Sequence, residues 1–400
     1  MERRIAEAIG RANQVFTPGS PVSRKDFFSG RQEQLDRVVA TITAPGRHPI
    51  IYGQRGVGKT SLANIISDSL TGNVMAAKIS CDGADTFETM WSRMLRSTSF
   101  TIPERTLGFA KDVTTRKTTL SELLGAGSWK GTPAEMADIL RRIPDVYSIF
   151  ILDEFDKVVN REAKASAADL IKTVSDNAPR VTIVVVGVAQ SISELIGEHP
   201  SIARNLVQIE LPVMTDEEIK SIFSRGCREL RLALDEPVLD EVASLANGFP
   251  HYAHLLGLES AITCFKRDWT KVDIRAFQHA CDQAVEGAQE KYRDAYSHAT
   301  ATTKRSRYPM IMCSCGYASH DDRGVFRATE VVDAMWTVFR EKVSVPSVLP
   351  ALGDFCLTER GGVLTKVPLR NRNHYKFTDP MMRPFLRIKT QSLLLTMQVG

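Results

Sequence analysis

The segment Gly53-Gln54-Arg55-Gly56-Val57-Gly58-Lys59-Thr60 constrains the fold more than any other part of this 400-residue chain. It joins a short apolar run, residues 48–52, to a stretch with helical spacing of apolar residues, 61–70. A glycine-rich turn between a buried strand and a helix directs backbone N–H groups at an anion. Lys59 can then reach the β- and γ-phosphates of a nucleotide, and the Thr60 hydroxyl can ligate Mg²⁺. The alternative, a fortuitous glycine-rich turn, is disfavoured by this strand-turn-helix context.

Composition places the chain among ordinary globular proteins, with 43% apolar and 24% charged residues. No apolar run approaches the roughly 20 residues of a membrane-spanning helix, so we expect no membrane partner. The N-terminal residues mix charged and apolar groups, unlike a signal peptide. Seven scattered cysteines fit a reducing, cytoplasmic location. The length predicts two or three domains.

A second motif, Asp153-Glu154, ends another apolar run at residues 147–152. This pattern predicts a buried parallel strand with two carboxylates at its C-terminal end, where ligands of open α/β sheets bind. We expect Asp153 to help hold Mg²⁺ and Glu154 to polarise the attacking water. Taken singly, either carboxylate could be a strand-end cap or a surface acid.

Further apolar runs at 74–80, 181–186 and 207–211 predict strands, separated by helical patterns at 86–95, 132–142 and 163–175. Strands that alternate with helices predict an α/β fold with a parallel sheet. The connection 101–131 is long and basic, and could be an inserted hairpin or a surface loop.

With these motifs, the chain resembles the AAA+ ATPases, in particular their initiator-type (origin-recognition-like) and STAND-like branches. Residues 28–35, Phe-Ser-Gly-Arg-Gln-Glu-Gln-Leu, resemble the Gly-Arg box that helps enclose the adenine in those branches. The resemblance spans about residues 15–390 and implies a P-loop parallel-sheet ATPase core, an all-α lid and a C-terminal winged helix. The implied boundaries are an N-terminal linker at 1–25, the core at 26–212, the lid at 213–290 and the winged helix at 300–390.

The resemblance also implies residues that complete the site. Arg204, which precedes the fifth strand, matches the arginine finger that reaches a neighbouring subunit's γ-phosphate; it could instead be an ordinary surface arginine. Gln190 or Ser191 occupies the first sensor position, with Gln190 preferred. A strand-end cap is the alternative for both.

In the lid, Asn247-Gly248-Phe249-Pro250-His251 resembles the Gly-x-Pro motif of these branches. Many relatives have an arginine after that proline, whereas this chain has His251. His251 is expected either to contact a phosphate weakly or to be a structural histidine. The predicted nucleotide-binding residues are Gly53, Gly56, Val57, Gly58, Lys59, Thr60, Ser61, Asp153 and His251.

The C-terminal module has three helical patterns, 308–318, 328–339 and 344–357, followed by a possible hairpin of 363–366 with 375–377. Residues 361–400 hold seven lysines and arginines against one acid, Asp379. Such a basic segment suits phosphate contacts with DNA, although it could equally be a solvated face. The predicted nucleic-acid contacts are Lys366, Arg370, Arg372 and Lys376.

Two functions remain open at this stage. The first is a protein that binds and hydrolyses ATP with Mg²⁺, assembles into a homo-oligomer and engages DNA. The second is a STAND-like signalling switch, for instance in bacterial defence, that activates a separately encoded effector protein.

Overall fold

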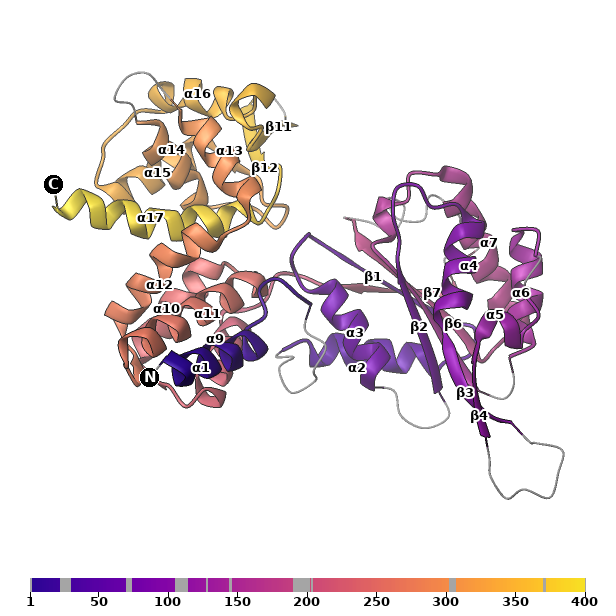
Figure 1. Ribbon diagram of the computed structural model, residues 1–400. Coiled ribbons are helices and arrows are strands. Elements are labelled where there is room, and N and C mark those ends of the chain that lie inside the picture. The colour runs from indigo at the N-terminus through magenta and orange to yellow at the C-terminus, as the bar shows by residue number, and fades with distance from the viewer. Residues whose placement is uncertain are drawn as a thin grey trace. The chain divides into compact units, whose positions relative to one another are not determined.

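The computed structural model contains a parallel five-stranded sheet with flanking helices and a second, mostly helical part (Figure 1). It describes residues 2–21, 30–69, 74–104, 114–126, 129–143, 146–189, 202, 204–301, 307–369 and 372–399. These residues divide into two compact units. The sheet unit comprises residues 21–54 and 58–212, and the helical unit comprises residues 1–20, 55–57 and 213–400.

The five strands of the sheet unit are all parallel and lie in the order β2-β5-β6-β1-β7. The strands are β1 (His48–Gly53), β2 (Val74–Ser80), β5 (Tyr147–Asp153), β6 (Val181–Val188) and β7 (Leu206–Glu210). Each lies within two residues of the limits that the sequence predicted. The prediction of an α/β parallel sheet is therefore confirmed.

Helices cover both faces of this sheet (Figure 1). They are α2 (Gln32–Ile42), α3 (Lys59–Ser69), α4 (Phe87–Ser97), α5 (Leu120–Leu123), α6 (Pro133–Arg141) and α7 (Arg161–Asn177). The buried cluster between α4, α6, α7 and the sheet includes Trp91, Met136 and Phe150. Helix α3 packs against β1, β2, β5 and β6, so the phosphate-loop helix is supported by four strands.

The long connection after α4 contains a two-stranded antiparallel hairpin, β3 (Ser99–Glu104) with β4 (Thr114–Thr119). Its first strand begins directly after α4, and its second strand ends at Thr119, which caps α5. One of the two structures considered for this connection is therefore present.

In the helical unit, α1 packs on the helices that follow the sheet unit in sequence. These elements are α1 (Glu2–Val15), α9 (Asp216–Glu229), α10 (Glu236–Ala246), α11 (Pro250–Arg267) and α12 (Ile274–Gly287). Thr215 caps α9 through a capping box with Glu218. The region expected to be all helical also contains a short parallel pair, β8 (Ala233–Leu234) with β9 (Lys271–Val272).

Phe16 anchors the segment that follows α1. Its side chain is 1% exposed and lies between α9 and α11. A Cβ on Gly226 would lie 2.1 Å from the Phe16 ring, and a Cβ on Gly257 would lie 2.3 Å from it. The two glycines therefore form a slot that only this ring fills.

The C-terminal part of the helical unit combines helices with a three-stranded sheet in the order β10-β12-β11. The helices are α13 (Glu290–Thr300), α14 (Tyr308–Tyr317), α15 (Ala328–Phe339), α16 (Val345–Asp354) and α17 (Met382–Val399). The strands are β10 (Phe326–Arg327), β11 (Leu364–Leu369) and β12 (Arg372–Phe377). The three helical patterns and the hairpin expected from the sequence are all present, and β10 was not expected.

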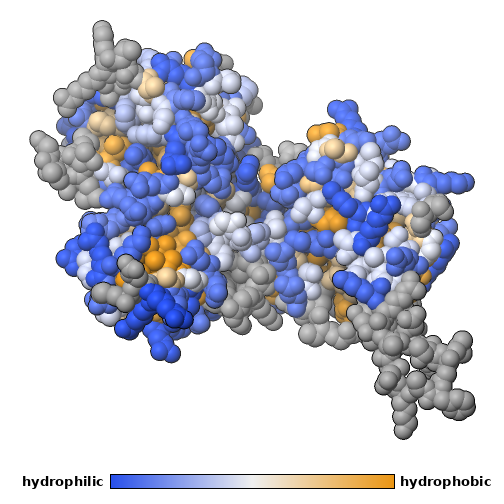
Figure 2. Space-filling view, viewed as in Figure 1, coloured by the Kyte–Doolittle hydropathy of each residue, from blue (hydrophilic) through white to orange (hydrophobic). Residues whose placement is uncertain are grey.

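The face shown in Figure 2 is mostly hydrophilic, and hydrophobic residues appear on it only in small patches. Within the described residues, no helix combines the length and apolar character that crossing a bilayer requires. All seven cysteines are free, and six of them are buried.

Candidate nucleotide site

The phosphate loop follows β1, which lies between β6 and β7 in the sheet. Gly53 has φ +152°, and a Cβ there would lie 2.3 Å from the Leu211 carbonyl oxygen. Gly58 has φ +98°, a region that side chains with a Cβ rarely adopt. Helix α3 then begins at Lys59. Only glycine allows the chain to turn this closely from strand to helix.

Lys59 is the central cation of the loop. It is 8% exposed, and its Nζ donates to the carbonyl oxygens of Gly53 at 3.0 Å and Gln54 at 2.7 Å. The ammonium group is thus held by two carbonyl oxygens of the loop, beside the N-terminus of α3. A buried lysine beside a helix N-terminus gives a site suited to a polyanion.

Asp153 ends β5 and lies beside the first turn of α3. The residue is 1% exposed, and its carboxylate accepts the backbone N–H of Glu154 at 2.9 Å and faces the Thr60 hydroxyl at 3.4 Å. A hydroxyl and a carboxylate that face one another supply the oxygen ligands that Mg²⁺ prefers. The two residues therefore fit a magnesium ion that binds together with phosphate groups.

Glu154 has an unusual backbone conformation. Its φ of +56° and ψ of +33° place it in the left-handed region, which costs a residue other than glycine about 1 kcal/mol or more. Its side chain is 40% exposed and pairs with Lys157 at 2.8 Å. The carboxylate expected to polarise water is therefore held by a surface lysine three residues further along.

Two residues that the sequence did not single out complete this cluster. Lys78 of β2 lies with its Nζ 3.4 Å from Asp153 Oδ2, and it also donates to Asn64 Oδ1 of α3. The only signal in the sequence was a single lysine inside the otherwise uncharged strand 74–80. That pattern does not specify which carboxylate the lysine meets.

Arg204 lies in the turn before β7, with its side chain 74% exposed and 3.9 Å from Asp176. Because β7 runs parallel to β1, with Leu206 opposite His48, Arg204 lies near the N-terminal end of β1. The phosphate loop follows the other end of β1, roughly 15–20 Å away at ~3.3 Å per strand residue. The structure does not bring Arg204 to the phosphate loop of its own chain.

Gln190 and Ser191, the first-sensor candidates, lie outside the described residues. Of the Gly-Arg box at residues 28–35, the structure describes residues 30–35. Arg31 is buried, begins α2 in a left-handed conformation and donates to the Pro212 carbonyl oxygen. It links the start of the sheet unit to that unit's last residue.

His251 lies in the first turn of α11, and its Nδ1 donates to the Pro18 carbonyl oxygen at 2.7 Å. Burial lowers its pKa. His254, one turn later, accepts the Thr17 backbone N–H at 3.3 Å, and burial lowers its pKa to about 4. Both histidines therefore contact the segment after Phe16, and for His251 this is the structural role that the sequence analysis gave as one of two alternatives.

The expected nucleic-acid contacts lie on or near the hairpin β11–β12. Lys366 is exposed on β11, and Lys376 is half-buried on β12. Arg372 begins β12, opposite Leu369. Arg370 lies outside the described residues, so the structure places three of the four.

Part of the basic C-terminal segment is buried. Arg383 donates to the Ala318 carbonyl oxygen at 2.8 Å and lies over the rings of Phe326 and Phe377. Arg387 donates to the Gly316 carbonyl oxygen at 2.9 Å. Both arginines thus stabilise the C-terminal end of α14, where cations are favourable. The surface of this module is less basic than the sequence count indicated.

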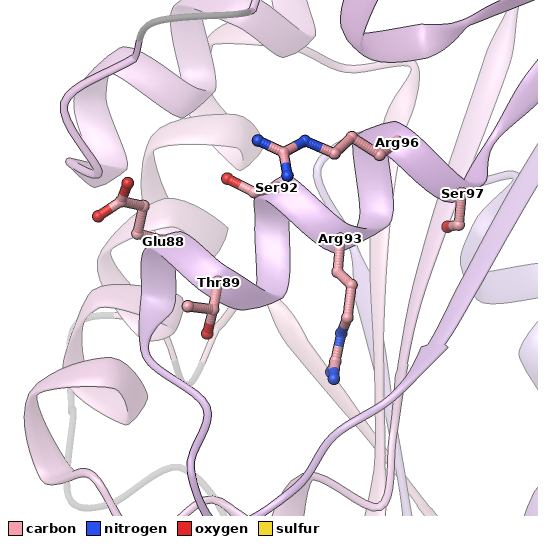
Figure 3. Close-up of a pocket in the computed structure, with 6 residues that line it drawn as sticks. All are labelled: Glu88, Thr89, Ser92, Arg93, Arg96 and Ser97. Carbon is pink, nitrogen blue, oxygen red and sulfur yellow. The ribbon is translucent and has the colours of Figure 1, made fainter.

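A separate groove of about 590 Å³ runs along α4 (Figure 3). Six side chains of this helix line it: Glu88, Thr89, Ser92, Arg93, Arg96 and Ser97. Arg93 extends away from Arg96 and pairs with Asp85 at 2.8 Å. No phosphate-loop residue lines this groove, so it is distinct from the candidate nucleotide site.

Comparison with known proteins agrees with this geometry. The family model described as novel STAND NTPase 1 matches residues 21–331. Among solved structures, the Walker-type ATPase PABY2304 of Pyrococcus abyssi has a TM-score of 0.51 at 17% identity, covering 93% of this chain and 99% of that chain. This similarity supports the fold of a Walker-type ATPase.

Two more distant matches complete the comparison. The ORC1 protein of Aeropyrum pernix, solved in complex with DNA, has a TM-score of 0.48 at 15% identity, covering 97% of this chain and 98% of that chain. ABC transporter G family member 49 of Oryza sativa subsp. japonica is 27% identical over 175 residues, which is 43% of this chain. The match spans only 10% of that transporter.

Proposed function

Because the chain belongs to the novel STAND NTPase 1 family, whose model matches residues 21–331, we propose that it binds ATP with Mg²⁺ and hydrolyses it. The observation that carries this proposal is the Thr60–Asp153 pair beside the buried Lys59. The hydroxyl and the carboxylate are two oxygen ligands beside a phosphate loop, which is the donor set that suits Mg²⁺ bound together with phosphate groups.

Each residue has a distinct part in this reaction. Lys59 exchanges the loop carbonyl oxygens for phosphate oxygens when nucleotide binds. Thr60 and Asp153 would hold Mg²⁺, which neutralises charge that develops on the transferred phosphoryl group. Glu154 leaves Lys157 and orients the attacking water. The glycines at 53, 56 and 58, with the neighbouring Val57 and Ser61, complete the anion site.

The test uses two substitutions in the full chain. Lys59→Ala should weaken binding of a fluorescent ATP analogue at least ~100-fold, because the loop loses its cation. Glu154→Gln should retain binding and lower the hydrolysis rate ~100-fold or more. Lys172→Ala, on the exposed side of α7, is the matched control for charge removal. If the Glu154→Gln variant hydrolysed ATP at the wild-type rate, Glu154 would not be the residue that orients the attacking water.

We further propose that ATP assembles a homo-oligomer in which Arg204 completes the site of a neighbouring copy. The Arg204 side chain is exposed and lies near the N-terminal end of β1, whereas the phosphate loop follows the C-terminal end of that strand. Both observations support a role between chains. Gln190 is proposed as the first sensor. Arg204→Ala should leave ATP binding unchanged and lower hydrolysis ~10³-fold in the assembled protein. Equal rates for the variant and the wild type would contradict this assignment.

DNA engagement is proposed for the C-terminal module, which we propose to be a winged helix. Lys366, Arg372 and Lys376, with Arg370, are its proposed phosphate contacts. Removing these four charges should weaken DNA binding and reduce the steepness with which salt weakens it. Equal affinity and salt dependence of the variant would exclude this surface.

A specific observation supports the second function, an ATP-driven switch that acts on a separate effector protein. Of the basic segment, Arg383 is buried and Arg387 is half-buried, and α16 carries no lysine or arginine. A module whose third helix, α16, has no basic residue suits protein contacts better than base readout. ATP-dependent co-purification of one defined partner, without DNA binding, would favour the switch.

A further inference from the structure

The carboxylate of Asp153 has a different partner on each oxygen. Oδ1 faces the Thr60 hydroxyl at 3.4 Å and accepts the Glu154 backbone N–H at 2.9 Å. Oδ2 faces Lys78 Nζ at 3.4 Å. The Asp153 side chain is 2% exposed, whereas that of Lys78 is 23% exposed. A carboxylate this deeply buried requires compensation for its lost hydration, and Lys78 supplies a full positive charge.

The sheet register explains how Lys78 reaches this position. Ser80 of β2 lies opposite Asp153, and Lys78 lies opposite Ile151, two residues before the strand end. Two strand residues span roughly 6–7 Å, which the four-carbon stem of lysine can bridge. The side chain therefore runs along the sheet toward the edge where the phosphate loop lies.

Lys78 is also connected to α3. Its ammonium group donates to Asn64, which follows Thr60 by four residues and so lies on the same face of the helix. One ammonium group thus joins β2, β5 and α3 around the pair expected to hold a metal ion. This arrangement orients Asp153 so that Oδ1, and not Oδ2, faces Thr60.

The charges in this cluster are unfavourable for a free divalent cation. Lys78 and Lys157 each pair with one carboxylate, Asp153 and Glu154 respectively. Lys59 adds a further positive charge that is held by carbonyl oxygens. The formal charges of these five groups, three lysines and two carboxylates, sum to +1. A dication is repelled by such a site until a polyanion accompanies it.

We propose that Lys78 is a positioning residue that orients Asp153 and offsets its charge, so that the divalent metal enters with the nucleotide and not alone. This inference rests on the proposed nucleotide binding. In this inference, the coupling between metal binding and nucleotide binding depends on Lys78, a residue outside the phosphate loop. A purely structural Lys78, joining β2 to α3, would leave that coupling unchanged when its charge is removed.

The experiment measures Mn²⁺ binding to the full chain by electron paramagnetic resonance, without nucleotide and with a non-hydrolysable ATP analogue. Lys78→Gln keeps a polar group near Asn64 and removes the charge, and Lys78→Met removes both. Both variants should bind Mn²⁺ without nucleotide at least tenfold more tightly than the wild type. Lys78→Arg should behave as the wild type, and Lys172→Met controls for charge removed from the exposed side of α7.

Further variants locate the tightened site. Adding Asp153→Asn to Lys78→Gln should abolish the gain, since the metal then lacks its carboxylate. Asn64→Ala, which keeps the charge of Lys78, should leave nucleotide-free Mn²⁺ affinity within threefold of the wild type. If Lys78→Met does not fold, Lys78→Gln carries the comparison.

The outcomes separate this inference from the proposed function. A wild-type protein that binds no ATP analogue would overturn the proposed function. A wild-type protein that binds the analogue, with unchanged nucleotide-free Mn²⁺ affinity in a folded Lys78→Gln variant, would overturn the inference alone. A tenfold gain that also appears in Lys78→Arg would overturn the charge argument.

Discussion

At the scale of single residues, Glu154 combines three structural features. It follows the buried Asp153, it has a left-handed backbone and its carboxylate pairs with Lys157 on the surface. The exposed pair itself contributes little to stability. The backbone conformation, by contrast, costs free energy that the surrounding sheet must supply.

Replacing Glu154 with Asn and, separately, with Gln distinguishes backbone strain from charge. Both changes remove the carboxylate, but Asn adopts the left-handed region several-fold more readily than most residues. We expect the Glu154→Asn variant to be more stable than the Glu154→Gln variant, with a free energy of unfolding that is higher by about 1 kcal/mol. Chemical denaturation of the two variants measures the difference. Equal stability would show that the position is not strained.

At the scale of secondary-structure elements, the sequence predicted the strands of the sheet unit closely. Apolar runs such as 147–152 and 181–186 are typical of strands buried on both faces of a parallel sheet. In a parallel sheet, the phosphate loop and Asp153-Glu154 both follow the C-terminal ends of their strands, so they lie at the same end of the sheet. The pairing of Lys78 with Asp153 was not predictable, because it depends on the register between strands that lie far apart in sequence.

The helical unit shows the same limit. The glycines at 226 and 257 look like weak points within predicted helices, and only the structure shows that Phe16 occupies the space they leave. Likewise, Arg383 and Arg387 are indistinguishable by sequence from surface cations. The packing of α17 against α14 buries Arg383 and half-buries Arg387.

Phe16→Ala should release the N-terminal segment from the helical unit. Truncating a buried phenylalanine costs about 3–5 kcal/mol when the site cannot collapse, and the rigid helices α9 and α11 hold this slot open. Hydrogen–deuterium exchange should become faster in α1 and in residues 16–18. Gln14→Ala, on the exposed side of α1, is the control and should leave exchange unchanged.

At the scale of the whole molecule, each unit contains a histidine that is buried in its neutral form. In the sheet unit, His48 Nδ1 accepts the Ile183 backbone N–H at 2.9 Å, and burial lowers its pKa to about 4. In the helical unit, burial likewise lowers the pKa of His254 to about 4. The unfolded chain therefore binds more protons than the folded chain between pH 6.5 and pH 4.

Both units should lose stability as the pH falls below about 6.5, the ordinary pKa of histidine. Each histidine contributes a loss of about 1 kcal/mol between pH 7.5 and pH 5.5, a window above the ordinary pKa of carboxyl groups. Thermal unfolding at the two pH values measures this loss. The His254→Gln variant should show a smaller loss of stability in the helical unit. A wild-type unfolding midpoint that does not change with pH would contradict the conclusion that these histidines are neutral in the folded protein.

Arg204 lies near the N-terminal end of β1, away from the phosphate loop of its own chain. This position has a consequence for how ATP consumption would depend on the amount of protein in a cell. If this arginine serves a neighbouring copy, turnover per chain depends on the abundance of the protein itself. Doubling the expression level would then more than double total ATP consumption while assembly is incomplete. Gene dosage, rather than ATP supply, would set the threshold at which the protein becomes active.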